Sequence, residues 1–304
     1  MAQSRVERPV RGTQLLVEHI SGVFRRPLLL AIEVGWRWLF GIPFLWVFWQ
    51  QAQRILAAYP LDSSGLVSLD TQNPWVEATQ ISTGLSFYEP HVLAALRWLL
   101  PAAAMVWIVI SGLGRAALIR RLDARMRFRP FTMMIFNAGW LALFAVVVWG
   151  WACSMQWLAA THIRVAGEPD LIGYFIWAIF LSLGFFTVFA LASWPFSIAQ
   201  LLAGLEGRSV FSALGESLRL GKHFTSKLVE INLVLGIVKL ALIVLAMVFS
   251  AAPLPFADEL GSGALQVAAA ASVVFYFLAN DFFQVVRLKA FVEFWKVFRG
   301  SASV

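Results

Sequence analysis

The sequence predicts an all-α integral membrane protein, a polytopic bundle of six transmembrane helices with amphipathic interfacial helices. Composition and six apolar stretches of membrane-spanning length carry this prediction. Of the 304 residues, 60% are hydrophobic and only 13% are charged, and the mean hydropathy is +0.75. A soluble domain is typically about 45–50% apolar and about 25% charged. The composition therefore excludes a water-soluble enzyme, and the single cysteine, Cys153, excludes an intrachain disulfide framework.

The six spans follow from bilayer dimensions. A hydrocarbon core of roughly 30 Å requires about 20 mostly apolar residues of α-helix. Six stretches meet this requirement, namely 28–49, 92–113, 131–158, 171–203, 228–249 and 264–286. We expect Pro195 to kink or end the membrane part of the fourth span, so that 196–203 runs on at the inner surface. One transmembrane domain, 28–286, is predicted.

The segments that flank this domain are both basic. Residues 1–27 read as an amphipathic segment in which Leu16, Ile20 and Val23 share a helical face. The same segment carries five arginines and no small-residue cleavage site follows the first span, so we do not expect a signal peptide. Residues 287–304 are predicted to form a basic tail.

The distribution of Lys and Arg predicts the orientation. Nineteen of the 24 basic residues fall in the two terminal segments and the second and fourth connections. Because basic residues are retained on the cytoplasmic side, we expect both termini to be cytoplasmic in a bacterial-type cytoplasmic (inner) membrane. The net charge of +7 reflects the excess of basic residues in these segments. It indicates anionic lipid headgroups as the partner and not nucleic acid.

One outer connection, 50–91, is long enough to fold onto the membrane or to serve a function. Its aromatic residues Trp75, Phe87 and Tyr88 are typical of the outer headgroup region. Whether this connection is ordered is left open by the sequence.

Charged residues within the apolar spans require partners or water. Four are predicted to form two pairs, Glu33 with Arg37 on one helix face and Asp281 with Lys239 between helices. Amide side chains fall at the same inner depth; they are Asn137, Asn232 and Asn280. This polar layer reads either as a structural network that joins helices or as a cavity that binds a lipid headgroup or small anion.

Small residues recur at four-residue spacing along the sixth span, at Ala264, Ala268 and Ser272. Such a stripe lets a second helix approach closely. Packing within the bundle is one interpretation, and a contact between two copies of the chain is the other.

No catalytic constellation is recognisable. His19, His91, His162 and His223 are scattered along the chain without metal-ligand spacing, so neither a zinc site nor another metal site is predicted. A phosphate-binding glycine loop and a G-x-S-x-G nucleophile turn are missing from the sequence as well. The sequence therefore predicts no cofactor and no enzyme; a lipid-modifying enzyme using Glu33 or Asp281 ranks last.

Residues 209–224 are predicted to form an amphipathic helix with Val210, Leu214, Leu218 and Gly221 on one face. Arg219, Lys222 and His223 lie near its end. An interfacial helix is the favoured interpretation, and a docking helix for a protein partner is the alternative.

The same segment carries a family resemblance. From Ser212 to Phe224 it reads Ser-Ala-Leu-Gly-Glu-Ser-Leu-Arg-Leu-Gly-Lys-His-Phe and leads into an apolar span. It resembles a loose group of bacterial six-helix proteins, including the membrane domain found ahead of some glycerophosphodiester phosphodiesterases. The resemblance implies six spans with both ends inside. It implies no activity, because the phosphodiesterase barrel and its acidic metal ligands are missing here.

These observations favour a non-enzymatic scaffold, accessory or lipid-binding role. The main alternative is a transporter or permease component with a polar path through Glu33, Arg37, Lys239 and Asp281.

Overall fold

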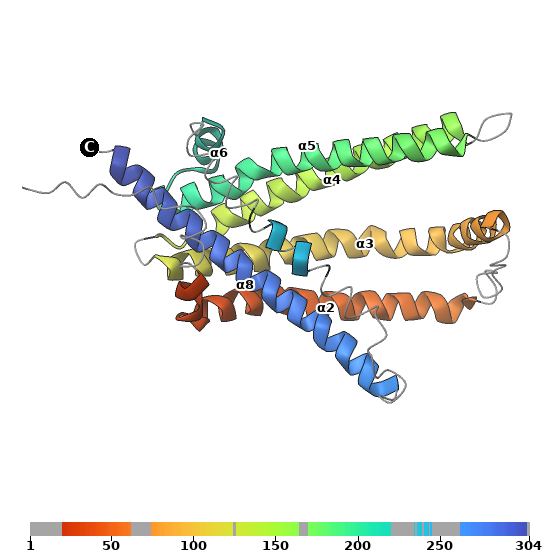
Figure 1. Ribbon diagram of the computed structural model, residues 1–304, viewed down its shortest axis with the longest axis horizontal. Helices are drawn as coiled ribbons and strands as arrows, with labels where there is room; N and C mark the ends of the chain where they lie inside the picture. Colours follow the sequence, from red (N-terminus) through yellow and green to blue (C-terminus); the bar gives the residue numbers. More distant parts are fainter. Residues whose placement is uncertain are drawn as a thin grey trace, which may run out of the picture. The chain divides into compact units, whose positions relative to one another are not determined.

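The structure is a computed structural model, and every regular element in its described part is an α-helix (Figure 1). It describes residues 20–61, 74–123, 126–163, 170–219 and 262–302, with isolated helical positions between 234 and 244. The helices are α2 (Pro27–Ala58), α3 (Pro74–Leu122), α4 (Pro130–His162), α5 (Leu171–Glu206), α6 (Val210–Arg219) and α8 (Ser262–Ala302). A short helical turn, 20–24, precedes α2.

Within the described residues, five helices are long and apolar enough to cross a membrane. They comprise Pro27–Ala58, Thr83–Leu122, Pro130–His162, Leu171–Glu206 and Ala270–Lys296. Four of these segments contain the first four predicted spans, and the fifth overlaps the predicted span 264–286 from Ala270 onward. The remaining predicted span, 228–249, lies largely outside the described residues. A multi-pass helical membrane protein is therefore supported by five spans.

The chain divides into two compact units. Unit 1 comprises Met1–Gly35 and Gly112–Val304, and unit 2 comprises Trp36–Ser111. Helices α2 and α3 contribute residues to both.

Unit 2 shows that the predicted long connection is much shorter than the sequence indicated. Helix α2 continues to Ala58 and α3 begins at Pro74, so most of 50–91 is helical. The Tyr59 ring stacks on His91 with centroids 3.8 Å apart, and the hydroxyl of Tyr88 donates to the Tyr59 carbonyl over 2.9 Å. These aromatic contacts join the end of α2 to α3. The sequence left open whether 50–91 is ordered, and the structure shows that 50–58 and 74–91 are helical, with Pro90 inside α3.

In unit 1, α5 passes through Pro195 without a break and ends only at Glu206. This agrees with the expectation that 196–203 runs on beyond Pro195, and the helix extends three residues further. At 36 residues α5 is about 54 Å long, which exceeds a hydrocarbon core of roughly 30 Å. Its last turns bury Ile198, Ala199 and Leu202 against protein rather than lipid. Pro195 has no backbone N–H, so the helix lacks one hydrogen bond there. The packing of these turns compensates for the lost stability.

Helix α8 likewise runs on beyond its predicted membrane part. The residues predicted as a basic tail continue the helix to Ala302. Val285, Phe291 and Trp295 are buried there. This stretch is therefore an integral part of the core, with apolar side chains spaced as on one helical face.

The buried core of unit 1 lies where the end of α3, the start of α4, the end of α5, α6 and the end of α8 meet. We call this the basic end, because Arg120, Arg121, Arg127 and Arg129 lie there. Its largest fully buried side chains include Leu118, Met133, Phe136, Leu202, Val285 and Val286. Gly112 permits a close helix approach, since a Cβ there would lie 3.1 Å from the backbone nitrogen of Met134.

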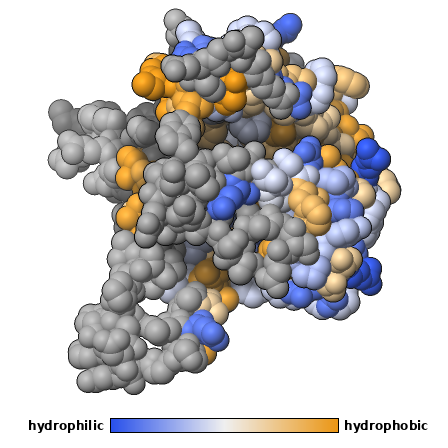
Figure 2. Space-filling model, turned by 90° about the vertical axis from the view of Figure 1, so that its right-hand side faces the viewer, coloured by the Kyte–Doolittle hydropathy of each residue, from blue (hydrophilic) through white to orange (hydrophobic). Residues whose placement is uncertain are grey.

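Away from the basic end, the helices expose large apolar side chains. Trp149 on α4 is 71% exposed and Ile179 on α5 is 66% exposed. Figure 2 shows one end of the molecule, where hydrophobic residues (orange) lie at the surface among hydrophilic ones (blue). Apolar surface of this extent is unfavourable in water and is expected where lipid surrounds the helices.

Candidate functional site

Five of the seven predicted polar-layer residues fall within the described residues. Glu33, Asn137 and Asp281 are buried, with 0%, 5% and 2% of their surface exposed. Asn280 is half-buried. Arg37, in unit 2, is half-buried with its guanidinium 5.2 Å from the centre of the Trp36 ring. Asn232 and Lys239 lie outside the described residues.

The clearest polar contact between helices joins α4 to α5. Gln200 Nε2 donates to Asn137 Oδ1 over 2.7 Å. Asn137 is buried and Gln200 is half-buried, so both amides are shielded from water. Polar contacts between membrane helices contribute about 0.6–2 kcal/mol each. This contact fixes the position of the two helices near the basic end.

Neither of the two buried acids of the described residues is an isolated charge. Glu33 and Asp281 each interact with another group. Two half-buried bases of the same unit, Arg115 and Arg287, also each take part in an interaction. The predicted pairs of Glu33 with Arg37 and of Asp281 with Lys239 stay predictions.

Gln284 was missed by the sequence reasoning. It is 5% exposed and lies three residues after Asp281 on α8. Residues three apart share a helix face, so Asp281 and Gln284 form a short buried polar stripe. The three-residue spacing of Asp281 and Gln284 is visible in the sequence and could have identified this stripe.

A second group of residues at the basic end holds α6 in place. Arg129, just before α4, donates through Nη1 to the carbonyl oxygens of Gly207 over 2.6 Å and Arg208 over 3.3 Å. These carbonyls follow the end of α5, where backbone acceptors lack helical partners. The Arg129 guanidinium thus caps α5 and fixes the turn that leads into α6.

Gly207 makes that turn. Its φ of 67° and ψ of 22° are left-handed, a conformation that glycine adopts at little cost after a helix. The chain reverses there and α6 begins at Val210.

Arg208 connects the turn to both helices. Its Nε lies 2.6 Å from Glu206 Oε2 and its Nη1 lies 2.9 Å from Glu216 Oε2. The hydrogen bond to Glu206 raises the pKa of Arg208 above its usual value, and Glu216 adds to the effect. We call Arg129, Glu206, Gly207, Arg208 and Glu216 the α5–α6 clamp.

Held in this way, α6 presents three faces. Ala213 and Ser217 are buried, with Val210 and Leu214 packed against the core. A second face carries Phe211 and Leu218, which are 87% and 68% exposed. Ser212, Glu216 and Arg219 lie on a third, polar face.

This arrangement corrects one part of the predicted amphipathic face. Val210 and Leu214 lie together on the inward face, packed against the core, whereas Leu218 points outward with Phe211. Leu218 follows Leu214 by four residues, but the inward direction is centred on Ala213 and Ser217. Gly221, Lys222, His223 and Phe224 lie outside the described residues.

An ion pair fastens the end of α8 to the end of α3, where Lys296 Nζ lies 2.6 Å from Asp123 Oδ2. Within α8, Lys289 Nζ lies 3.7 Å from Glu293 Oε1. The Phe24 and Phe282 rings pack with centroids 4.7 Å apart, which joins the first turn to α8.

At the other end of α4 and α5, an acid caps a helix. Asp170 Oδ1 accepts from the Gly173 amide over 2.9 Å, and Oδ2 lies 3.2 Å from His162 Nδ1. The Gly173 hydrogen bond, followed by the contact with His162, lowers the pKa of Asp170 below its ordinary value. This cap fixes the start of α5 next to the end of α4.

The small-residue stripe on the last span is only partly described. Ser272 is half-buried and interacts with another group. Nothing is described for the side chains of Ala264 and Ala268, so the contact between two copies stays a prediction. Among the described residues, no group of three His, Cys, Asp or Glu side chains is placed to hold a metal ion.

Comparisons with protein-family models, with curated protein sequences and with solved structures find no match to this chain.

Proposed function

We propose that the chain is a non-enzymatic scaffold or accessory protein of a bacterial-type cytoplasmic membrane, and that α6 attaches its basic end to anionic lipid. The observation that carries this proposal is the outer apolar face of α6. Phe211 and Leu218 are exposed on a helix that the α5–α6 clamp holds in one position.

The chemistry of α6 fits a headgroup boundary. Amphipathic helices lie in the interface with apolar side chains toward the acyl region and basic side chains toward headgroups. Phe211 and Leu218 supply the first, and Arg219 on the neighbouring face supplies the second. A basic residue near an anionic surface contributes about 1 kcal/mol.

The orientation belongs to the same proposal. Nineteen of 24 basic residues fall in the two terminal segments, the 115–129 connection and the connection 204–227 that contains α6, which favours a cytoplasmic location for all of them. The test uses Cys153→Ala as background with either Ser209→Cys or Ser63→Cys. An impermeant thiol reagent applied from outside should label Ser63→Cys and spare Ser209→Cys. The reverse labelling would contradict the orientation.

The lipid contact of α6 is tested by depth measurement. Spin labels at Leu218→Cys and, as a matched control on the polar face, Ser212→Cys are compared in vesicles with and without phosphatidylglycerol. We expect the Leu218→Cys label to be accessible to oxygen and shielded from a water-soluble relaxer, and the Ser212→Cys label to show the opposite. Equal, water-like accessibility at both positions would reject the proposal.

A second candidate is a transporter or permease component. Burial of the acids Glu33 and Asp281 supports it, because ionisable residues inside membrane segments often line a substrate path. Native mass spectrometry on protein extracted in lipid-preserving particles distinguishes the candidates. Under the scaffold proposal we expect a retained protein partner or anionic lipid; a stoichiometric small solute without either would favour the transporter.

A further inference from the structure

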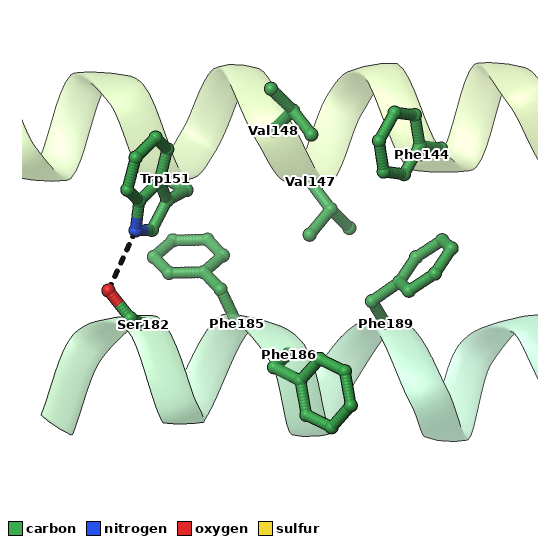
Figure 3. Close-up of a pocket in the computed structure, with 8 residues that line it drawn as sticks. All are labelled: Phe144, Val147, Val148, Trp151, Ser182, Phe185, Phe186 and Phe189. Atoms are coloured by element: carbon green, nitrogen blue, oxygen red, sulfur yellow. Dashed lines mark hydrogen bonds between the residues drawn. The ribbon is translucent and has the colours of Figure 1, made fainter. Parts of the chain in front are cut away.

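A groove in the apolar part of unit 1 lies between α4 and α5 (Figure 3). It has a volume of about 220 Å³. Its lining residues are Phe144, Val147, Val148, Trp151, Ser182, Phe185, Phe186 and Phe189. Figure 3 shows Val147, Phe185 and Phe189 pointing into the space between the two helices.

Both ends of the groove are closed by contacts between α4 and α5. At one end the rings of Trp140, Phe144 and Phe189 pack against one another, each pair with centroids less than 6 Å apart. At the other end Trp151 Nε1 donates to Ser182 Oγ over 3.0 Å (Figure 3). From Phe144 to Trp151 the groove extends about 10 Å along α4.

The groove offers no attachment point for a polar ligand. Its lining holds no charged side chain, and the indole nitrogen and the hydroxyl bond to each other. A bound headgroup, ion or polar solute would lose hydration without gaining a hydrogen bond. Its occupant is therefore apolar.

A transmembrane helix does not fit the groove. Membrane helices approach closely where small residues face each other. The lining is mostly Phe, Trp and Val, and Ser182 is already bonded. Gly150, the nearest small residue on α4, is covered by Phe185, whose ring would lie 3.2 Å from an added Cβ.

A flexible hydrocarbon chain fits both the lining and the surroundings. The groove lies away from the ends of α4 and α5, two helices that are long and apolar enough to cross a membrane. In a bilayer, acyl chains surround this part of such helices. Its volume exceeds that of an engineered apolar cavity of about 150 Å³ that holds a benzene molecule. It therefore takes a segment of a chain rather than a whole lipid.

We propose that this groove binds an acyl chain of a membrane phospholipid and retains it longer than the surrounding lipid. The proposal requires the chain to be embedded in a membrane, but it does not depend on α6. It therefore stands or falls separately from the lipid contact at the basic end.

The test is photocrosslinking in phosphatidylethanolamine–phosphatidylglycerol vesicles that contain a trace of phospholipid with a diazirine on its acyl chain. The apolar stretch 175–180 of α5, whose Phe175, Ile179 and Phe180 are more than 60% exposed, reports bulk lipid. We expect labelling of 144–151 and 182–189 to exceed that of 175–180 by about fivefold, the ratio that roughly 1 kcal/mol of preferential binding gives. Equal labelling would overturn the proposal.

Variants make the test specific to the groove. Val147→Phe should fill it and reduce the excess labelling to the level of 175–180. Val148→Phe, at the rim, is a second filling variant in case the first fails to fold. Val146→Phe is the matched control, because Val146 is 65% exposed and does not line the groove; it should keep the excess. Retained labelling in a folded filling variant would contradict the proposal.

A separate experiment tests whether a second copy of the chain occupies the groove. With Cys153→Ala as background, Val148→Cys is treated with a thiol crosslinker in the same vesicles. We expect monomers only. Efficient dimer formation through this position would assign the groove to a protein contact and overturn the phospholipid assignment.

Discussion

The guanidinium of Arg129 lies against the backbone of Gly207, seventy-eight residues further along the chain, with Nη1 donating to the carbonyl oxygen over 2.6 Å. The contact joins the residue before α4 to the turn that ends α5. It determines the direction of α6, and hence which of its apolar side chains face outward.

Replacing Arg129 should loosen α6 selectively. In Arg129→Ala, the carbonyls of Gly207 and Arg208 lose a charged donor, which costs about 1–3 kcal/mol. Hydrogen exchange in 210–219 should increase accordingly, while exchange in 144–158 stays unchanged. Arg129→Lys should restore little, because an ammonium does not reproduce the fork of the guanidinium. Equal effects on both segments would indicate a general loss of fold instead.

Two glycines near the clamp should respond to alanine in opposite directions. Gly207→Ala places a Cβ on a left-handed residue and 3.3 Å from Arg129 Nη2, so it should destabilise by about 1–2 kcal/mol. Gly215→Ala lies inside α6 with no atom within 4 Å of the new Cβ, so it should stabilise by up to about 1 kcal/mol. Thermal unfolding in nanodiscs, followed by Trp fluorescence, measures both. A stable Gly207→Ala would contradict the assigned turn.

The Asn137–Gln200 contact should behave as a coupled pair. Asn137→Leu alone leaves the Gln200 amide without its acceptor and should cost about 0.6–2 kcal/mol, and Gln200→Leu should cost about the same. The double variant should cost less than the sum, because neither amide is then left unpaired. Thr187→Ala is the control, since the Thr187 hydroxyl bonds only within its own helix, to Leu183. Additive costs would show that the contact is not formed.

The Asp170 cap should weaken in acid. Because the folded-state pKa of Asp170 is lowered, the stabilisation is complete above its ordinary value of 3.8 and is lost as the pH falls through the folded-state pKa. The expected effect is small, since the group is exposed. Hydrogen exchange at the first turn of α5, corrected for intrinsic rates, should show reduced protection in acid. Asp170→Asn keeps an acceptor and should remove this pH dependence.

The intramembrane charges separate the two candidate functions. Under the scaffold proposal Asp281 has a structural role in the predicted pair with Lys239, so Asp281→Leu alone should cost about 3–5 kcal/mol by leaving a buried charge unpaired. The paired variant, Asp281→Leu with Lys239→Leu, should recover most of that stability. A transport path predicts instead that the paired variant folds but loses uptake in a reconstituted system. Chemical unfolding measures the stability of each variant, and a flux assay measures its uptake.

Much of the fold was accessible because hydropathy and helix length are local properties. The apolar runs at 131–158 and 171–203 gave α4 and α5 to within a few residues at three of their four ends. The sequence left open whether Pro195 kinks the helix or ends its membrane part, because a proline inside a helix is tolerated when neighbouring packing compensates, and packing is not a local property. The same reason explains why the tail after Val286 proved helical: Phe291 and Trp295 find partners that are distant in the sequence.

The sequence by itself determined that this is a helical, multi-pass membrane protein with charged side chains inside its apolar runs, because a charge in an apolar run is visible without coordinates. It also identified the α6 segment as amphipathic. Only the tertiary structure decided that Leu218 faces outward with Phe211, that Arg129 caps the end of α5, and that Trp151 and Ser182 close an apolar groove. Each of these depends on which side of one helix meets another, and that is settled by packing between distant residues rather than by any stretch of the chain alone.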